Sequence, residues 1–372
     1  MASHLKDMNR LVIYKLICES ESISRTEISN QTGISGPTVL KVMEYLTQTG
    51  LVLETGTVDT PLGRKPQMYT LNKDRFYCIG IHHEGEYLTA GLLNLKSEFK
   101  AFKRIHARKS IDVIFDKLLP EVIDGLLAES GAPLGHVMGI GIGLPCVFNS
   151  VHNILKDAPS LGIYKEINIE PQIQALKDRY KKDVILDNDL NMGVMGEFNA
   201  LRLSPEDDLV YISLGTGLGS GVILQGNLRR GVDGMCGEIC YMSLCDKIGD
   251  PNKMWLENKI NLDALTEKFG ISDGQEIPED ILDECVEYVS EYLSICINNV
   301  LMCYDCGNIS LGGHVFSLLG EGLFLAVKRK VEQLAPANAV LYHQASTYPG
   351  VVGACLTVMN EHLESELANC NA

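Results

Sequence analysis

No stretch of the 372-residue sequence approaches the roughly 18 uninterrupted apolar residues that a membrane-spanning helix needs. The first nine residues are polar and lack the apolar core of a secretory signal peptide. The twelve cysteines lack the spacing of a disulfide framework, which is typical of reduced thiols in a cytoplasm. We therefore expect a cytoplasmic protein with no membrane partner. The length and the 45% hydrophobic content favour a globular α/β protein of two or three domains.

Positive charge is scarce, because 32 lysines and arginines stand against 48 aspartates and glutamates, a net charge of −16. This deficit argues against nucleic-acid binding by the surface as a whole. The charge is uneven, however, since residues 1–75 carry nine basic and eight acidic side chains, a net charge of +1, and the remainder carries −17. An acidic body repels phosphates, so we expect contact with DNA only through residues 1–75. We also expect the affinity to depend on two such units in one dimer.

The first 75 residues, called the head below, show the pattern of a helix-turn-helix. Apolar residues at helical spacing over residues 11–17 predict a helix that ends near Glu19. Ser24 and Glu27 have the spacing of a capping box, which begins a second, short helix. Gly33 is suited to end that helix.

A third helix is expected to follow, with Ser35 at its N-cap and Pro37 in its first turn. Its inward stripe comprises Val39, Val42, Met43 and Leu46. In a recognition helix the outward residues at the N-terminal end meet the base edges of the major groove. The residues of this helix predicted to contact DNA are Ser35, Gly36, Thr38 and Lys41.

Two short strands, at residues 51–53 and 67–71, complete the pattern of a winged helix-turn-helix. The turn-rich segment 59–66 between them carries Arg64 and Lys65, which are predicted to reach phosphates or the minor groove. The alternative is a three-helix module that serves only dimerisation or packing. The ordered set of three helices, a glycine turn and a basic wing favours DNA binding.

Strand-turn-strand patterns next to glycines recur in the body, at residues 78–93 and 210–224. Two such units about 130 residues apart indicate two similar lobes that face each other across a cleft. In the second unit the glycines have no side chains, so an anion can approach the backbone closely and bind its N–H groups. The residues concerned are Gly215, Thr216, Gly217, Gly219 and Gly221. The alternative is a tight hairpin with no ligand.

Asp187, Asn188 and Asp189 follow a predicted strand at residues 183–186, where ligands of α/β proteins usually bind. These side chains suit the hydroxyl groups of a sugar, and Asp189 could act as a general base on one of them. The alternative is an Asx turn, or a cap of the helix that follows.

In combination these motifs resemble the repressor branch of the ROK family, a group of repressors, open reading frames and sugar kinases. In the head the resemblance rests on residues 9–10, 23–25, 32–35, 38–39 and 63–66. In the body it rests on residues 141–143, 158–161, 187–191, 215–217, 231–234 and 237–238. It implies a winged helix-turn-helix at 1–75 and the two-lobed α/β fold of the actin-like ATPases (hexokinase and Hsp70) at 76–372. Lobe 1 would cover about 76–195 plus the C-terminal helix, and lobe 2 about 196–350.

The sequence departs from the kinases of that family in the loop that holds the phosphates of ATP. Where those kinases have Asp-x-Gly-Gly-Thr, this sequence has His82 for the aspartate, Glu84 for the first glycine and Glu86 for the threonine. Two carboxylates facing the phosphates would repel the nucleotide, and phosphoryl transfer depends on positioning and charge stabilisation. We therefore expect neither ATP nor catalysis, although Asp189 occupies the position of the catalytic base.

The resemblance also predicts that the structural zinc site of the family is lost. The positions of its histidine and three cysteines here hold Tyr241, Ser243, Cys245 and Trp255. One ligand of four cannot build a tetrahedral zinc site, so no metal is expected. Cys236 and Cys240 lie nearby but off the pattern, as alternative ligands, and Cys303 and Cys306 are interpreted as buried thiols.

The sugar-contacting positions of the family are partly kept. By resemblance they are Asn188, Asp189, Glu238, Tyr241, Glu257 and Ser160. The leading hypothesis is a repressor of carbohydrate-metabolism genes, a homodimer or tetramer that binds double-stranded operator DNA. It would respond to a sugar or sugar phosphate without phosphorylating it. The alternatives are an ATP-dependent sugar kinase with a DNA-binding head, and a DNA-binding protein that has lost its ligand.

Overall fold

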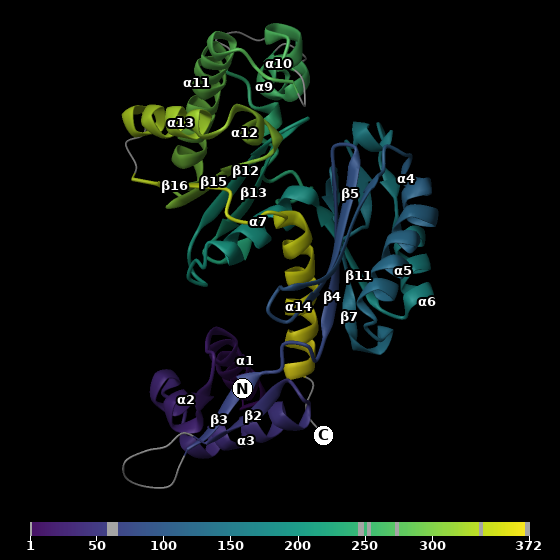
Figure 1. Cartoon of the computed structure of the whole chain (residues 1–372), viewed down its shortest axis with the longest axis vertical. Coiled ribbons are helices and arrows are strands. Elements are labelled where there is room, and N and C mark those ends of the chain that lie inside the picture. The colour runs from purple at the N-terminus through teal and green to yellow at the C-terminus, as the bar shows by residue number, and fades with distance from the viewer. Residues whose placement is uncertain are drawn as a thin grey trace.

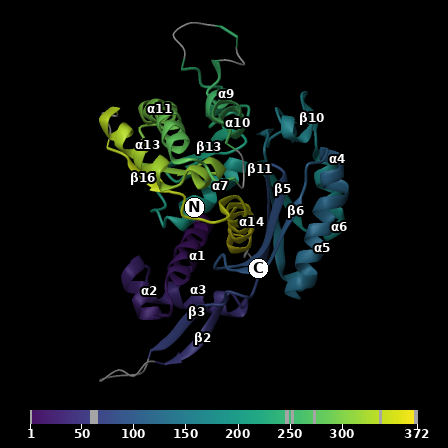
Figure 2. The same cartoon turned by 45° about the horizontal axis from the view of Figure 1, so that its top comes forward.

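The structure, a computed structural model, describes residues 2–57, 66–244, 249–250, 254–271, 275–334 and 338–368. Figure 1 shows the head at one end of the molecule and two larger lobes beyond it. Helix α14 (Pro349–Ala368) lies between the lobes, and its C-terminal end reaches the head (Figures 1 and 2). This one helix therefore contacts both the head and the sheet of lobe 1.

The head, in its described part, contains three helices and a three-stranded antiparallel sheet of order β1-β3-β2. The helices are α1 (Ala2–Glu19), α2 (Arg25–Thr32) and α3 (Gly36–Gln48), and the strands are β1 (Ile23–Ser24), β2 (Val52–Thr57) and β3 (Gln67–Leu71). The predicted helices and hairpin are confirmed, whereas β1 was not predicted. Arg64 and Lys65 lie outside the described residues.

Local hydrogen bonds explain where the head helices begin and end. The Ser24 hydroxyl accepts from the Glu27 amide at 3.3 Å, and the Ser24 amide donates to the Glu27 carboxylate at 2.8 Å, so the predicted capping box is present. Gly33 ends α2 with a φ of 70°, a left-handed conformation that glycine adopts without steric cost. Ser35 is the N-cap of α3 by position only, because its side chain makes no capping bond and lies 3.0 Å from the Thr38 hydroxyl.

Each lobe is built on a five-stranded sheet, and the two sheets have the same topology. Their orders are β11-β7-β4-β5-β6 and β14-β13-β12-β15-β16. In lobe 1 the strands are β4 (Tyr77–Glu84), β5 (Tyr87–Asn94), β6 (Phe99–His106), β7 (Val137–Leu144) and β11 (Asp183–Asn188). In lobe 2 they are β12 (Leu209–Leu214), β13 (Leu218–Leu224), β14 (Asn227–Leu228), β15 (Asn308–Gly312) and β16 (Val340–His343). In each sheet the first strand pairs antiparallel with the second and parallel with the fourth, so both predicted hairpins are confirmed.

Helices cover the outer face of each sheet (Figure 1). On lobe 1 these are α4 (Ile111–Val113), a π-helical turn (Ile114–Leu118), α5 (Leu119–Ser130) and α6 (Glu170–Tyr180). A small sheet of β8 (Val147–Asn149), β9 (Ile154–Lys156) and β10 (Ile167–Asn168) adjoins them. On lobe 2 they are α9 (Glu257–Ile260), α10 (Leu262–Phe269), α11 (Glu279–Tyr304), α12 (His314–Leu319) and α13 (Glu321–Leu334).

Two helices, α7 (Asp189–Ala200) and α14, pack against each other between the sheets. A side chain at Gly353 of α14 would collide with the Met192 carbonyl of α7, and one at Gly196 of α7 with the Pro349 carbonyl of α14. Glycine is therefore needed at both positions for so close an approach. Because α7 also packs on β12 and β13, the expected lobe boundary near residue 195 falls inside a helix that contacts both sheets.

The head and lobe 1 share one hydrophobic core. Ile13 and Ile17 of α1 belong to the same buried cluster as Cys78 of β4 and Val358 and Met359 of α14. Moving the head relative to α14 would expose this apolar surface, at a cost of about 25 cal/mol per Å². The head is therefore mechanically connected to the C-terminal helix.

Candidate functional site

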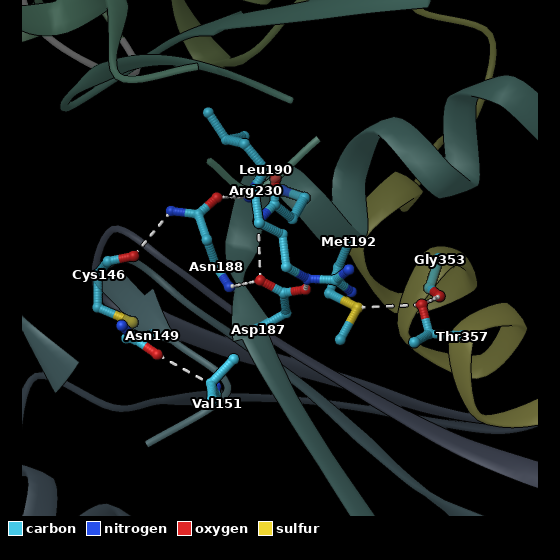
Figure 3. A network of polar contacts seen from close by, with 11 residues as sticks. Cys146, Asn149, Val151, Asp187, Asn188, Leu190, Met192, Arg230, Gly353 and Thr357 are labelled. Carbon is cyan, nitrogen blue, oxygen red and sulfur yellow. Dashed lines mark hydrogen bonds and ion pairs between the residues drawn. The ribbon is translucent and has the colours of Figure 1, made fainter. Parts of the chain in front are cut away.

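Asn188 caps the helix that begins at the end of β11. Its Oδ1 accepts from the amides of Leu190 at 2.8 Å and Asn191 at 3.0 Å, and its Nδ2 donates to the Cys146 carbonyl at 2.9 Å (Figure 3). The helix-cap interpretation therefore holds for this residue. Its carbonyl oxygen is used twice inside the protein, which leaves only the second amide hydrogen for a ligand.

Asp187 is 1% exposed and joins the two lobes. Its Oδ1 accepts from the Asn188 amide at 2.8 Å and from Asn191 Nδ2 at 2.7 Å. Its Oδ2 lies 2.6 Å from Nε of Arg230, which follows β14 of lobe 2 (Figure 3). Arg230 was not predicted as a site residue, although it immediately precedes the glycine-rich segment 231–234.

Asp189 is the first residue of α7, and its carboxylate accepts from the Leu190 amide at 3.0 Å. Burial, together with the negative charges of Glu84 and Glu238, raises the pKa of Asp189 to about 7. At neutral pH this carboxyl group therefore exchanges readily between its protonated and ionised forms. It can accept a hydrogen bond from a hydroxyl group or take up a proton.

Glu238 contributes to the raised pKa of Asp189, and Glu257 in turn acts on Glu238. Burial and the charges of Glu257 and Asp157 raise the pKa of Glu238 above its usual range. Burial raises the pKa of Glu257, and the hydrogen bond from the Leu218 amide opposes that rise. We call the five residues Glu84, Asp157, Asp189, Glu238 and Glu257 the acidic cluster. Asp157 was missed, although it directly precedes the motif at residues 158–161.

Tyr241 stands beside the acidic cluster. Burial, the Cys240 thiol and then the charges of Asp157, Glu238 and Glu257 raise the pKa of Tyr241 to about 12. The Tyr241 ring packs edge-to-face on the ring of Trp255, with centroids 4.8 Å apart, and Tyr241 is 37% exposed. Ser160 is exposed in the 3-10 turn Pro159–Leu161, and its contact with a sugar stays a prediction.

Two backbone donors at the glycine loop, residues 215–217, are used within the protein. The Gly215 amide donates to the Gly217 carbonyl at 2.8 Å, and the amide of Leu218, which follows the loop, donates to Oε2 of Glu257 at 2.9 Å. Thr216 is exposed, and a side chain at Gly85 would lie 3.8 Å from it, so the turns of the two hairpins face each other. An internal carboxylate therefore occupies part of the predicted anion cradle.

Gly219 and Gly221 have a packing role that was not predicted. Both belong to strand β13, and a side chain at Gly221 would collide with the Leu190 carbonyl. A side chain at Gly219 would lie 2.6 Å from Leu190 Cδ1. Helix α7 fills the space that a side chain would need at these two positions, so its packing on β13 requires glycine there, and the part of the two glycines in an anion site stays a prediction.

The end of β4 places the residues of the altered kinase loop on different sides. Side chains alternate along a strand, so Glu84 shares the face of His82, whereas His83 points into the lobe and lies 3.3 Å from the Ala107 carbonyl. Glu84 raises the pKa of Asp189 and so lies near it. Glu86 instead pairs with His106 at 3.0 Å and Arg108 at 2.6 Å. The prediction of two carboxylates facing the site is therefore wrong for Glu86, because these two side chains of the adjacent edge bind it.

The cysteines near the positions that correspond to the lost zinc site make other contacts. Cys240 donates to Glu238 at 3.4 Å, and Cys236 lies 3.9 Å from the Tyr304 hydroxyl. No group of three histidine, cysteine, aspartate or glutamate side chains that could hold a metal ion occurs in the described part of the chain, and Cys245 lies outside it. The aromatic side chains of Tyr241 and Trp255 do not fit a zinc site. Cys306 is buried as predicted, but Cys303 is exposed, which corrects that expectation.

The surface predicted to bind DNA is partly described. Ser35, Gly36 and Lys41 are exposed at the N-terminal end of α3, and Thr38 is half-buried. Helix α3 therefore presents the expected residues to solvent, and the wing residues stay a prediction. Among the helices that the structure describes, none is both long and apolar enough to cross a bilayer.

Curated relatives include proteins named as xylose repressors. A xylose repressor from Caldicellulosiruptor bescii is 29% identical over 248 residues, which cover 66% of this chain and 61% of that protein. The chain thus spans about 61% of the length of this relative.

Solved structures show the same fold. A ROK family transcriptional regulator, described as a homologue of the E. coli Mlc protein, has a TM-score of 0.77 and 21% identity, and the match covers 98% of this chain and 99% of that chain. A ROK hexokinase from Thermus thermophilus has a TM-score of 0.61 and 20% identity, covering 77% of this chain and 99% of that one. The fold is therefore a winged helix-turn-helix followed by a two-lobed actin-like ATPase fold. The sequence model described as the ROK family matches residues 78–360, well over half of the chain, and the chain therefore belongs to the ROK family.

Proposed function

We propose that the protein is a repressor of carbohydrate-metabolism genes whose ROK domain binds a sugar or sugar phosphate and whose head binds double-stranded operator DNA. The observation that carries the proposal is the path of α14, which begins beside the candidate sugar site and ends in the core of the head. The printed names of relatives, a xylose repressor and a transcriptional regulator, support the same function.

The N-terminal end of α14 contacts His82, a residue beside Asp189 of the candidate site. A side chain at Gly350 of α14 would collide with the His82 ring. On the opposite side, a side chain at Gly143 would lie 3.4 Å from His82 Cδ2 and 3.3 Å from the Cα atom of Asp189. His82 is therefore packed between α14 and the start of α7, where a ligand bound to Asp189 would shift its ring.

The other end of α14 lies in the head. The helix has 20 residues and is therefore about 30 Å long. Val358 and Met359, at the middle of the helix, and Leu363, closer to its C-terminal end, belong to the same buried cluster as Ile13 and Ile17 of α1. A sugar that binds one arrangement of the lobes more tightly would shift α14 and with it the head. In a homodimer or tetramer this shift would change the spacing of two heads on the operator.

The ROK domain is proposed to bind its ligand without phosphorylating it. Glu257 occupies the Leu218 amide next to the glycine loop, and Glu84 adds a negative charge near Asp189. Both oppose the phosphates of ATP. The rival function is a sugar kinase with a DNA-binding head, and one observation favours it: a pKa of about 7 at Asp189 suits a general base at neutral pH.

The test is a thermal-shift screen of the full chain with xylose, glucose, N-acetylglucosamine and their phosphates, repeated with Asp189→Ala. We expect one ligand to stabilise the wild type, to lose its effect in Asp189→Ala, and to change the affinity for genomic fragments selected for binding. Glu121→Gln, an exposed change on α5, is the control that keeps the shift.

Two outcomes would contradict the proposal. Ligand-dependent consumption of ATP that disappears in Asp189→Asn would establish the kinase. A sugar that stabilises the protein but leaves its DNA affinity unchanged would refute the coupling through α14.

A further inference from the structure

The candidate sugar site is rich in negative charge and poor in positive charge. Among the described residues, the neighbouring charges that shift the pKa values of Asp189 and Glu238 are all carboxylates. The cation beside the end of β11, Arg230, pairs through Nε with the Asp187 carboxylate at 2.6 Å, and that carboxylate offsets its positive charge. The Nε2 atom of His82, which packs beside Asp189, is buried without a hydrogen-bond partner in the described part of the chain, and desolvation lowers the pKa of this histidine. The histidine therefore adds no positive charge at neutral pH.

Two backbone donors beside the glycine loop, the amides of Gly215 and Leu218, are also occupied. Oε2 of Glu257 accepts from the Leu218 amide at 2.9 Å and would lie 3.0 Å from a side chain at Gly217. The Gly215 amide is used within the loop, by the Gly217 carbonyl at 2.8 Å. A phosphate entering here would have to displace a carboxylate and would then meet its charge.

The same groups suit hydroxyls. An ionised carboxylate only accepts hydrogen bonds, and each hydroxyl of a sugar can donate one. Tyr241, 37% exposed beside Glu238 and Glu257, offers an aromatic face to the apolar side of a sugar ring. From these observations we infer that the effector is an uncharged sugar and that the site rejects its phosphorylated form. This inference rests on the proposed function, because it concerns the ligand of the same site.

The size of the discrimination follows from Coulomb's law. A phosphate carries a charge of about −1.5 to −2 at neutral pH. At roughly 9 Å in a water-like medium, one carboxylate weakens its binding about fivefold. Several members of the acidic cluster together should therefore favour the unphosphorylated sugar by at least about tenfold. Since the discrimination is electrostatic, added salt should reduce it.

The experiment is calorimetric titration of the full chain with matched pairs: xylose and xylose 5-phosphate, glucose and glucose 6-phosphate, and N-acetylglucosamine and its 6-phosphate. We expect the unphosphorylated member of the binding pair to have the lower Kd by about tenfold or more. The Kd of the phosphorylated sugar divided by the Kd of the unphosphorylated sugar should decrease when the salt concentration is raised from about 0.05 M to about 0.5 M, because salt screens the charges. In Glu84→Gln it should fall by about fivefold, and in the control Glu121→Gln it should stay the same.

Each other outcome has a distinct meaning. Tighter binding of a phosphorylated sugar would overturn the inference and leave the proposed function standing. A ratio that ignores both salt and Glu84→Gln would overturn it as well, because the selection would then be steric. If no member of any pair binds, the proposed effector function itself fails.

Discussion

Replacing Arg230 by methionine should weaken the connection between the lobes and lower the free energy of unfolding by about 2 kcal/mol. The guanidinium Nε lies 2.6 Å from Oδ2 of Asp187, whose side chain is 2% exposed, against 36% for the arginine side chain. Removing one partner of a buried ion pair costs about 3–5 kcal/mol. We reduce that figure because water reaches the arginine. Asp187 also keeps its hydrogen bonds from Asn188 and Asn191.

The assay is urea and thermal unfolding of the full chain. A loss of about 2 kcal/mol should lower the Tm by about 3 °C for a ROK domain of roughly 300 residues. Arg229→Met is the matched control, because this neighbouring arginine is exposed and, among the described bonds, its side chain donates only to the Leu224 carbonyl at 3.1 Å. It should cost less than about 0.5 kcal/mol.

A double-mutant cycle isolates the interaction itself. Asp187→Asn removes the charge, so adding Arg230→Met to it should cost much less than Arg230→Met alone. The expected coupling energy is about 1–2 kcal/mol. A coupling energy below about 0.5 kcal/mol, or an equal loss in Arg229→Met, would refute the claim that this ion pair joins the lobes.

Three further predictions follow from local geometry. Ser24→Ala removes the capping box and should destabilise the head by about 1 kcal/mol, seen as faster amide exchange in α2; unchanged exchange would contradict it. Asp189 has a pKa of about 7, so the folded chain keeps a proton that the unfolded chain releases near pH 4. The contribution of this proton to the free energy of unfolding is complete below about pH 4 and is lost as the pH rises to about 7. In Asp189→Asn the free energy of unfolding should therefore change by about 2 kcal/mol less than in the wild type between about pH 5 and 8. An identical pH profile in the two proteins would disprove the raised pKa. Gly353→Ala should cost about 2 kcal/mol in thermal unfolding through its collision with the Met192 carbonyl. Gly125→Ala in α5, which meets only Lys103 Cε at 3.2 Å, should be neutral or stabilising, and equal losses would argue against helix crowding.

Much of the head and of the two sheets is predictable from sequence, because the signals are local. The capping box of Ser24 and Glu27 and the left-handed Gly33 involve residues within a few positions of one another. Both body hairpins arise from adjacent strands joined by short turns. In contrast, the side of the turn to which Glu86 points was not predictable, because it depends on the partners that β6 supplies.

The site was only partly predictable for the same reason. Motif matching identified Asp189, Glu238 and Glu257, yet it missed Arg230 and Asp157. Their roles depend on which loops of lobe 1 and lobe 2 meet. The role of a glycine is also ambiguous in sequence. The pattern around Gly219 predicts an anion site, whereas in the structure the absence of a side chain at Gly219 makes room for α7.

The sequence by itself determined the elements, their order, the nearly neutral head on an acidic body, and the residue types at the candidate sugar site. Only the tertiary structure decided which of those groups are free to act. Asp187 meets Arg230 across 43 positions, Leu218 meets Glu257 across 39, and α14 meets β4 across 277. Such contacts form because burial of apolar surface brings distant segments together, and a local pattern carries no record of which partner each polar group will then find.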